Sequence, residues 1–166
     1  MINTGLNDKK MIGRATYLTL PQLELSMVPA KIDTGAYRSA IHASNIEIVN
    51  LDGRKVLRCN ILGGHRSSEG GVEFETDQFK SVVIANSFGH KESRYEVLLR
   101  CVLAGVSFTT GFTLANRLEK IYPALIGRKA TNGRFIVDTS LTDINRIELK
   151  NAYNINLSYD EEDSDL

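Results

Sequence analysis

The sequence is poor in features that would tie it to nucleic acid, to a membrane or to export. It has no tryptophan, only two cysteines and no excess of charge, since 20 Lys and Arg balance 20 Asp and Glu. A neutral chain gives no global reason to bind nucleic acid or an anionic membrane. No apolar run approaches the roughly 18 residues of a membrane-spanning helix, and residues 1–10 lack the apolar core of an export signal. We therefore expect a cytoplasmic protein.

Cofactor motifs are also missing. The sequence holds no Gly-x-x-x-x-Gly-Lys-Ser/Thr loop for ATP and no His-Glu-x-x-His pair for zinc. His42, His65 and His90 stand far apart in the sequence, whereas a metal site needs three or four converging ligands. We expect these histidines at the surface or in loops. Cys59 and Cys101 lie in strand-like runs, which predicts two buried, reduced thiols. The sequence thus predicts neither a metal nor another cofactor.

What the sequence does contain is a succession of short strand-like segments. Runs rich in branched residues alternate with turn signals such as Asp52-Gly53 and Ala104-Gly105. Helical turns are predicted only at 115–121 and 128–131. This pattern predicts an all-β fold, a small closed or nearly closed β barrel with one or two short helices. The clearest strand-like runs cover residues 54–62, 79–85, 95–103, 106–114 and 134–138.

The length of 166 residues fits one domain with its own hydrophobic core. We predict that this domain covers residues 11–150. Residues 1–10 are expected to be flexible. Residues 151–166 form an acidic tail, which is expected to be disordered because its like charges repel one another.

One segment carries a catalytic signal. Residues Val28 to Ile32 are typical of a short strand, and Asp33, Thr34 and Gly35 follow it as a tight turn. Glycine permits a close approach of the backbone, and the threonine can hydrogen-bond nearby backbone groups. Asp33 is therefore expected to be held rigidly at a strand end, as a catalytic carboxylate must be. Taken alone, this tripeptide is also common in solvated turns.

Two further segments make the pattern specific. The apolar run 123–126 ends in Gly127-Arg128, and a glycine-rich loop, 63–71, lies between the two motifs. In this order the three features resemble the retropepsin family of aspartic peptidases. The sequence is most similar to a bacterial branch described as ATP-dependent zinc proteases and linked to RimK-type glutamate ligases. This similarity is carried by residues 12–14, 30–36, 39–40, 89, 94–95, 113–117, 122–128 and 135–138.

The resemblance implies a retropepsin-like barrel in which the two motifs pack as crossing strands. Loop 63–71 falls where the family has its flap, and loop 86–93 is a second glycine-rich candidate for a cover. The resemblance also implies a role for each matching residue: catalysis for Asp33, Thr34 and Gly35; substrate contact for Ala36, Gly64 and Gly70; support of the site for Gly127 and Arg128.

One position departs from the viral members of the family. Those enzymes carry, shortly after the first motif, an aspartate that pairs with the arginine of the Gly-Arg segment. Here Tyr37 and Arg38 stand in that region. Arg128 must therefore have another partner.

Peptidases of this kind hydrolyse an amide with two carboxylates that share one proton and activate a water. This sequence offers one Asp-Thr-Gly. We favour a homodimer, in which a twofold axis brings two copies of Asp33 together. Asp138, followed by Thr and Ser140, is the alternative second carboxylate. Asp138 could instead be structural and pair with Arg128 or Arg14.

Basic residues near the motifs point to a substrate class. Arg38, Arg94 and Arg117 could form a basic rim, because guanidinium groups bind carboxylates with two parallel hydrogen bonds. Together with the link to glutamate ligases, this predicts a peptide or protein substrate that is rich in glutamate. A non-catalytic module that binds acidic peptides, and a zinc peptidase, are the alternatives.

Overall fold

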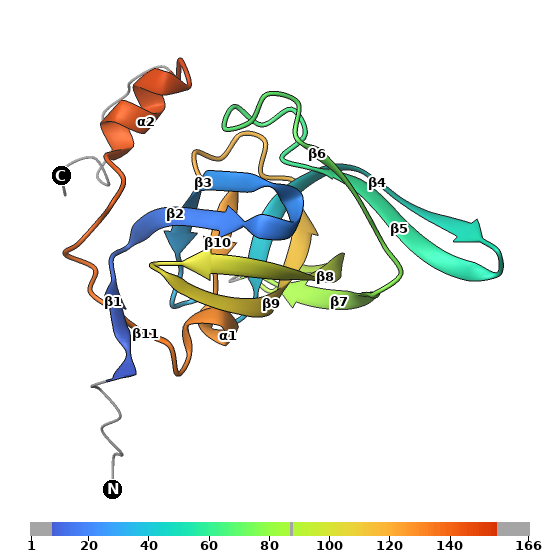
Figure 1. Cartoon of the computed structure of the whole chain (residues 1–166), viewed down its shortest axis with the longest axis horizontal. Helices are drawn as coiled ribbons and strands as arrows, with labels where there is room; N and C mark the ends of the chain where they lie inside the picture. Colours follow the sequence, from blue (N-terminus) through green and yellow to red (C-terminus); the bar gives the residue numbers. More distant parts are fainter. Residues whose placement is uncertain (1–7, 87, 156–166) are drawn as a thin grey trace, which may run out of the picture.

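The computed structural model describes residues 8–86 and 88–155, which fold into a mostly β structure (Figure 1). The helices are α1 (Arg128–Thr131) and α2 (Arg146–Ala152). The strands are β1 (Lys10–Ile12), β2 (Ala15–Leu20), β3 (Leu25–Ile32), β4 (Ser39–Leu51), β5 (Arg54–Ile61), β6 (Val72–Thr76), β7 (Phe79–Ala85), β8 (Lys91–Leu103), β9 (Val106–Ala115), β10 (Ala124–Ile126) and β11 (Phe135–Val137).

Six strands form a closed ring. They follow the order β10, β3, β2, β8, β9 and β4, and β10 also pairs with β4, which joins the two ends. The short strand β10 runs parallel to β3 and antiparallel to β4, so it lies between the two strands that flank the Asp33 turn. This arrangement confirms the predicted barrel.

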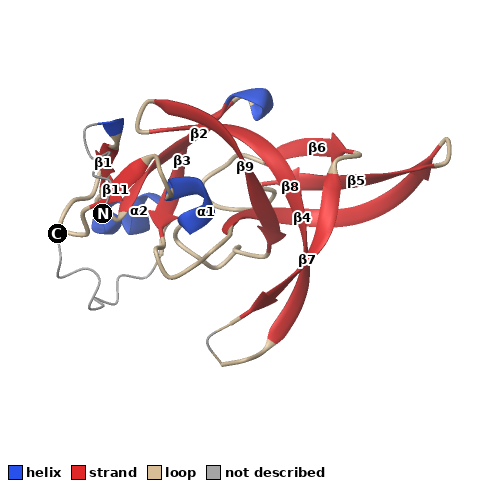
Figure 2. Cartoon of the chain, turned by 90° about the horizontal axis from the view of Figure 1, so that it is seen from below, coloured by secondary structure: helices blue, strands red, loops and turns tan. Residues whose placement is uncertain are grey.

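Strands β4 and β8 are long enough to pair with one strand outside the ring as well as with their neighbours in it. Strand β4 pairs with β9 over residues 39–42 and with β5 over residues 43–51. Strand β8 pairs with β9 over residues 96–103 and with β7 over residues 91–97. The outer halves of β4 and β8 therefore leave the ring as two projecting hairpins, one with β5 and one with β7 (Figure 2).

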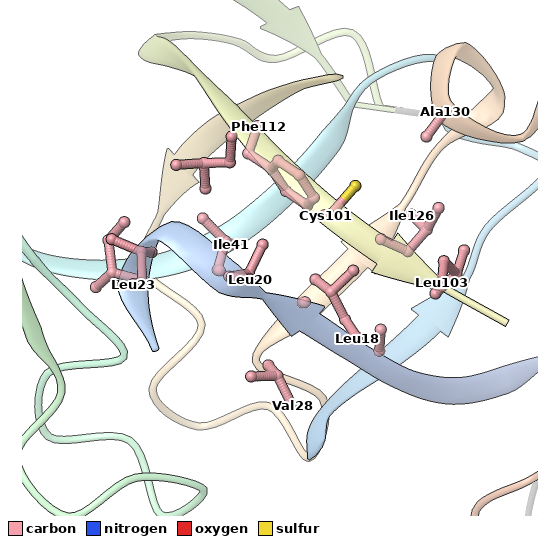
Figure 3. Close-up of a cluster of buried hydrophobic side chains, with 14 of the residues drawn as sticks. Leu18, Leu20, Leu23, Val28, Ile41, Cys101, Leu103, Phe112, Ile126 and Ala130 are labelled. Carbon is pink, nitrogen blue, oxygen red and sulfur yellow. The ribbon is translucent and has the colours of Figure 1, made fainter. Parts of the chain in front are cut away.

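The ring encloses the hydrophobic core. Along β8 the residues Val97, Leu99 and Cys101 are buried while their neighbours Leu98 and Arg100 are exposed, as the alternation of a strand requires. Leucine, isoleucine and valine side chains of β2, β3, β4 and β10 gather around the fully buried ring of Phe112 from β9 (Figure 3). Branched and aromatic residues in these strands thus close the barrel by packing.

Several local predictions can now be compared with the structure. The turns at Asp52-Gly53 and Ala104-Gly105 have positive φ at both residues and join adjacent strands, as two-residue hairpin turns do. The helix predicted at 115–121 is wrong, because β9 runs to Ala115 and an irregular loop follows it. Helix α1 is confirmed at 128–131, whereas helix α2 was not predicted.

The predicted flexible segment, 1–10, and the predicted acidic tail, 151–166, lie mostly outside the described residues. At their edges, β1 begins at Lys10 and α2 continues to Ala152. The thiols of Cys59 and Cys101 are free and buried, as predicted, and burial raises the pKa of each to about 11. Among the described residues, no helix has the length and apolar character needed to cross a membrane.

Candidate active site

Asp33 follows β3 and is held by its own turn. Its amide donates to the carbonyl of Ile126 at 2.9 Å, which ties the residue to β10. Its carboxylate oxygen Oδ1 accepts hydrogen bonds from the amides of Gly35 at 2.9 Å and Ala36 at 3.1 Å. Within the described residues the second oxygen, Oδ2, has no such donor, so it stays available to a water or a substrate. The half-buried carboxylate is therefore fixed in orientation by the backbone that follows it.

Arg128 holds the turn from the other side. Its Nη1 donates to the carbonyls of Thr34 and Gly35, both at 2.9 Å, and its amide donates to the carbonyl of Ala36 at 2.8 Å. Arg128 therefore donates to backbone carbonyls, whereas in the viral enzymes the arginine of the Gly-Arg segment pairs with an aspartate. The expectation of another partner is met, and the partner is the Asp33 turn itself.

Gly127 allows this contact because it has no side chain. A Cβ atom at this position would lie 2.6 Å from the carbonyl carbon and oxygen of Arg38 and 2.8 Å from the carbonyl oxygen of Tyr37. Its amide donates to the hydroxyl of buried Ser39 at 3.1 Å. The start of α1 is thereby pressed against the chain that leaves the Asp33 turn.

Two adjoining pockets flank the turn. The first, which we call the arginine pocket, has a volume of about 410 Å³, and the second, the Asp33 pocket, of about 420 Å³. Arg117 and Leu125 line both, so the two pockets adjoin, and we call them together the cleft. The arginine pocket is lined by Gly35, Ala36, Tyr37, Arg38, Ala40, Val83, Ile84, Ala85, Arg94, Thr113, Arg117, Leu125 and Arg128. The Asp33 pocket is lined by Lys31, Asp33, Arg117, Glu119, Lys120, Ile121, Tyr122, Leu125 and Arg146.

The structure brings the predicted basic residues together. Arg38, Arg94 and Arg117, which are far apart in the sequence, line one pocket with Arg128, and no carboxylate is among its lining residues. Burial lowers the pKa of Arg117, the neighbouring charge of Arg94 lowers it further, and the carboxylate of Asp33 raises it. Arg117 thus lies within electrostatic reach of both the arginine cluster and the candidate catalytic group.

The two glycine-rich loops take different places. Gly64 and Gly70, in the loop that joins β5 to β6, are not among the residues that line either pocket. The second loop forms the tip of the β7–β8 hairpin, and residues 83–85 of that hairpin line the arginine pocket. Of the two loops predicted as a cover, the β7–β8 hairpin therefore lies nearer to the cleft than loop 63–71 does. The substrate contacts of Gly64 and Gly70 stay a prediction.

The expectation that all three histidines lie at the surface or in loops is wrong for His42, which is buried in a strand, whereas His65 lies in a loop but is also buried. His42 is on β4 with 2% of its surface exposed, His65 is 1% exposed, and their ring centres are 5.6 Å apart. Only His90, at the tip of the β7–β8 hairpin, is exposed. Within the described residues there is no group of three His, Cys, Asp or Glu side chains placed to hold a metal ion.

Asp138 lies in a turn after β11, outside both pockets. Its Oδ1 accepts from the amide of Ser140 at 2.9 Å and from the Ser140 hydroxyl at 2.6 Å, and these hydrogen bonds lower the pKa of the carboxyl. Arg14 donates to the carbonyl of the next residue, Thr139, at 2.9 Å. In its observed contacts, Asp138 acts as a local turn former.

Comparison with known proteins adds a family. The profile of the RimB-like family, described as "Retropepsin-like aspartic endopeptidase RimB", matches residues 11–148. A probable alpha-L-glutamate ligase of Desulfotalea psychrophila is 28% identical over 149 residues, which are 87% of this chain and 32% of the relative. A probable alpha-L-glutamate ligase of Parasynechococcus marenigrum is 28% identical over 152 residues, 89% of this chain and 33% of the relative. The chain thus spans about a third of the length of these curated relatives.

A solved structure is also similar. It is that of Lpg0085 from Legionella pneumophila, a protein of unknown function, with a TM-score of 0.64 and 30% sequence identity. The match covers 80% of this chain and 95% of that chain.

Proposed function

The chain belongs to the RimB-like family of retropepsin-like aspartic endopeptidases, and from this premise we propose that it hydrolyses peptide bonds with Asp33 as a catalytic carboxylate. The observation that carries the proposal is the geometry of the turn. The Asp33 carboxylate is oriented by two backbone amides and borders an open cleft. Rigid placement beside space for a substrate is what a group that activates water needs.

We further propose that the active species is a homodimer. An aspartic peptidase uses two carboxylates that share one proton, because two like charges at hydrogen-bond distance resist full ionisation. Asp138 is held by Ser140 and does not line the cleft with Asp33. These contacts favour a second copy of Asp33, supplied by a symmetry mate, as the missing group.

The cleft favours an acidic substrate. Four arginines line the arginine pocket, and Lys31, Lys120 and Arg146 line the Asp33 pocket. A peptide with several glutamate side chains would place its carboxylates against these cations, and each contact would be a charge-assisted hydrogen bond. The glutamate ligase names of the relatives agree with a glutamate-rich peptide or protein as substrate. A cytoplasmic location, which we also propose, is compatible with two free thiols.

The test is to compare Asp33→Asn with Asp138→Asn on paired peptides, one rich in glutamate and one rich in glutamine. Asp33→Asn is nearly isosteric but cannot ionise, so hydrolysis should fall by at least about a thousandfold, to background, while the fold survives. Asp138→Asn should keep most of its activity. The glutamate-rich peptide should be cleaved faster, and its advantage should shrink in high salt, which screens exposed charges.

Each contrary result has a distinct meaning. Retention of most activity by Asp33→Asn would refute the catalytic assignment, and a large loss in Asp138→Asn would make that residue the second carboxylate. If wild type binds the acidic peptide but never cleaves it, the protein is a binding module of the same fold. Equal rates on both peptides at all salt concentrations would remove the case for an acidic substrate.

A further inference from the structure

Two buried histidines tie together the loops behind the cleft. His42, on β4, has its Nε2 3.0 Å from the carbonyl oxygen of Gly63, and its Nδ1 accepts from the amide of Arg117 at 2.9 Å. His65 has its Nε2 2.8 Å from the carbonyl oxygen of Lys120. The two rings therefore connect β4, loop 62–71 and loop 116–122.

The hydrogen-bond partners fix the protonation of both rings. In His42 the Nδ1 atom accepts an amide hydrogen bond, so the proton must be on Nε2, where a carbonyl accepts it. In His65 the Nδ1 atom accepts from the amide of Ser67 at 3.1 Å, so Nε2 again carries the proton toward a carbonyl. Each ring thus uses both nitrogens as hydrogen-bond partners of the backbone, Nε2 as the donor and Nδ1 as the acceptor.

Loop 116–122 is the part of the molecule that these rings hold. It follows β9, has no regular secondary structure, and contributes Arg117, Lys120 and Tyr122 to the Asp33 pocket. The backbone of Arg117 is bound by His42, and the backbone of Lys120 is bound by His65. Two of the cations in the cleft therefore depend for their position on the histidine pair, because regular strand pairing does not hold them.

We infer that His42 and His65 are positioning residues for substrate binding, which hold Arg117 and Lys120 at the cleft, and that protonation of His65 releases this hold. This inference rests on the proposed function, since it assigns the two cations to the binding of an acidic peptide. The histidines themselves do not line the pockets. They act through the backbone of loop 116–122.

The surroundings explain why protonation would disrupt the pair. Burial lowers the pKa of His65, the hydrogen bond to the Lys120 carbonyl raises it in part, and the positive charges of His42, Arg117 and Arg66 lower it. The ring of Tyr153 closes the remaining side, edge-on, with ring centres 6.0 Å apart. A proton on Nδ1 of His65 would face the Ser67 amide, which is itself a donor, so that amide contact would have to open; the Ser67 hydroxyl, 2.8 Å from Nδ1, would be left as the acceptor.

The first experiment measures binding without hydrolysis. All proteins carry Asp33→Asn, and a fluorescently labelled glutamate-rich peptide reports affinity by anisotropy, with a glutamine-rich peptide as the comparison. His42→Leu removes both hydrogen bonds, and we expect the dissociation constant for the acidic peptide to rise about tenfold, the effect of losing one charge-assisted contact. His42→Asn keeps an acceptor near the Nδ1 position and should recover much of this loss.

The second experiment uses pH. As the pH falls from 7 into the acid range below the ordinary imidazole pKa of about 6.5, where a lowered pKa places the protonation of His65, the affinity of the Asp33→Asn protein for the acidic peptide should fall severalfold. His65→Gln retains a donor for the Lys120 carbonyl but cannot take up a proton, so its affinity should change far less over this range. His90→Gln, at the exposed histidine, should behave like the parent and serves as the matched control.

The outcomes separate this inference from the proposed function. If the parent protein binds the acidic peptide no better than the glutamine peptide, the acidic-substrate proposal fails. If the parent binds it selectively but His42→Leu, still folded in a thermal melt, binds equally well, the positioning role is refuted. If His42→Leu does not fold, the affinity of His42→Asn and the pH dependence of binding by His65→Gln test the inference instead. If His65→Gln loses as much affinity in acid as the parent protein does, the inference is refuted.

Discussion

Glu96 offers the sharpest test of how the arginine pocket is built. Its side chain is buried, with 2% exposed, and it faces three cations: Arg38 in a short ion pair, Lys80 at 3.1 Å and Lys129 at 3.9 Å. Space for the carboxylate exists because residue 111 is glycine; a Cβ there would lie 2.6 Å from the Glu96 carboxyl carbon. Glu96→Gln would remove the charge and keep the volume.

The expected cost follows from these contacts. Breaking a buried ion pair typically costs about 3–5 kcal/mol because a charge is left buried without a partner. Here the charges left behind are those of Arg38, Lys80 and Lys129, whose side chains are 25%, 59% and 37% exposed and can regain hydration. We therefore expect a loss of about 2 kcal/mol for Glu96→Gln, which corresponds to a fall in melting temperature of roughly 4–8 °C.

The pH dependence gives the prediction a sign. Burial alone would raise the pKa of Glu96, but the hydrogen bonds from Arg38 and Lys80 and the charges of Arg38 and Lys129 outweigh it, so the pKa lies below its ordinary 4.5. A lowered carboxyl pKa stabilises the fold above pH 4.5, and this contribution is lost as the pH falls through the folded-state pKa. The difference in stability between wild type and Glu96→Gln should therefore be full at pH 7 and shrink in acid.

Urea unfolding of both proteins between pH 3 and pH 7 measures this difference. The exposed ion pair of Arg58 and Glu75 supplies the matched control, and Glu75→Gln should change stability by less than about 1 kcal/mol. Equal stability of wild type and Glu96→Gln at pH 7, or a difference that does not depend on pH, would refute the reasoning.

Three further predictions concern the site. Arg128→Leu removes the Nη1 atom that donates to the carbonyls of both Thr34 and Gly35, so it should lower stability by about 1–2 kcal/mol in urea unfolding and reduce turnover more than it raises KM; unchanged turnover would count against its support of the turn. Activity per chain should fall on dilution below the dimer dissociation constant, and full activity of a monomer in light scattering would exclude the dimer. Arg117→Gln should raise KM for a glutamate-rich peptide more than for a glutamine-rich one, and an equal loss on both would contradict its role in recognition.

Much of the fold could be predicted from local sequence. Strand β7 has the bounds that were predicted, and the turns at Asp52-Gly53 and Ala104-Gly105 fix two hairpins because glycine readily adopts the positive φ that they require. The Asp33 turn and the apolar-Gly-Arg segment were also identified, and the structure places them in contact through Arg128. These features depend on residues close in sequence or on a motif that a family shares.

What could not be predicted depends on contacts between distant segments. The segment 115–121 has helix-forming residues, but His42 binds the amide of Arg117 from another strand and the loop stays irregular. The two buried histidines are far apart in the sequence, because the β4–β5 hairpin separates residues 42 and 65. The pairing of β4 with β5 brings His42 in β4 and His65 in the following loop close together. A polar residue inside an apolar strand, such as His42 in β4, was the available signal.

The contacts of the four pocket arginines show that they are not equivalent. Arg38 is bound to buried Glu96, Arg94 donates to Glu92 at 2.8 Å, and Arg128 is bound to the Asp33 turn. Among the contacts within the described residues, the guanidinium of Arg117 donates only from Nε, to the carbonyl of Tyr122 at 3.1 Å. Its two terminal nitrogens are therefore the donors best placed to take a substrate carboxylate with two parallel hydrogen bonds.

This difference changes what a substitution at each arginine would report. Loss of Arg38 would leave the buried Glu96 with fewer partners and would weaken the fold before it altered recognition. Loss of Arg117 would not leave a carboxylate as buried as that of Glu96 without a partner. The Asp33 carboxylate would still accept hydrogen bonds from the amides of Gly35 and Ala36. Selectivity for acidic peptides should therefore be concentrated in Arg117, whose position the histidine pair controls, while Arg38 acts mainly as part of the frame.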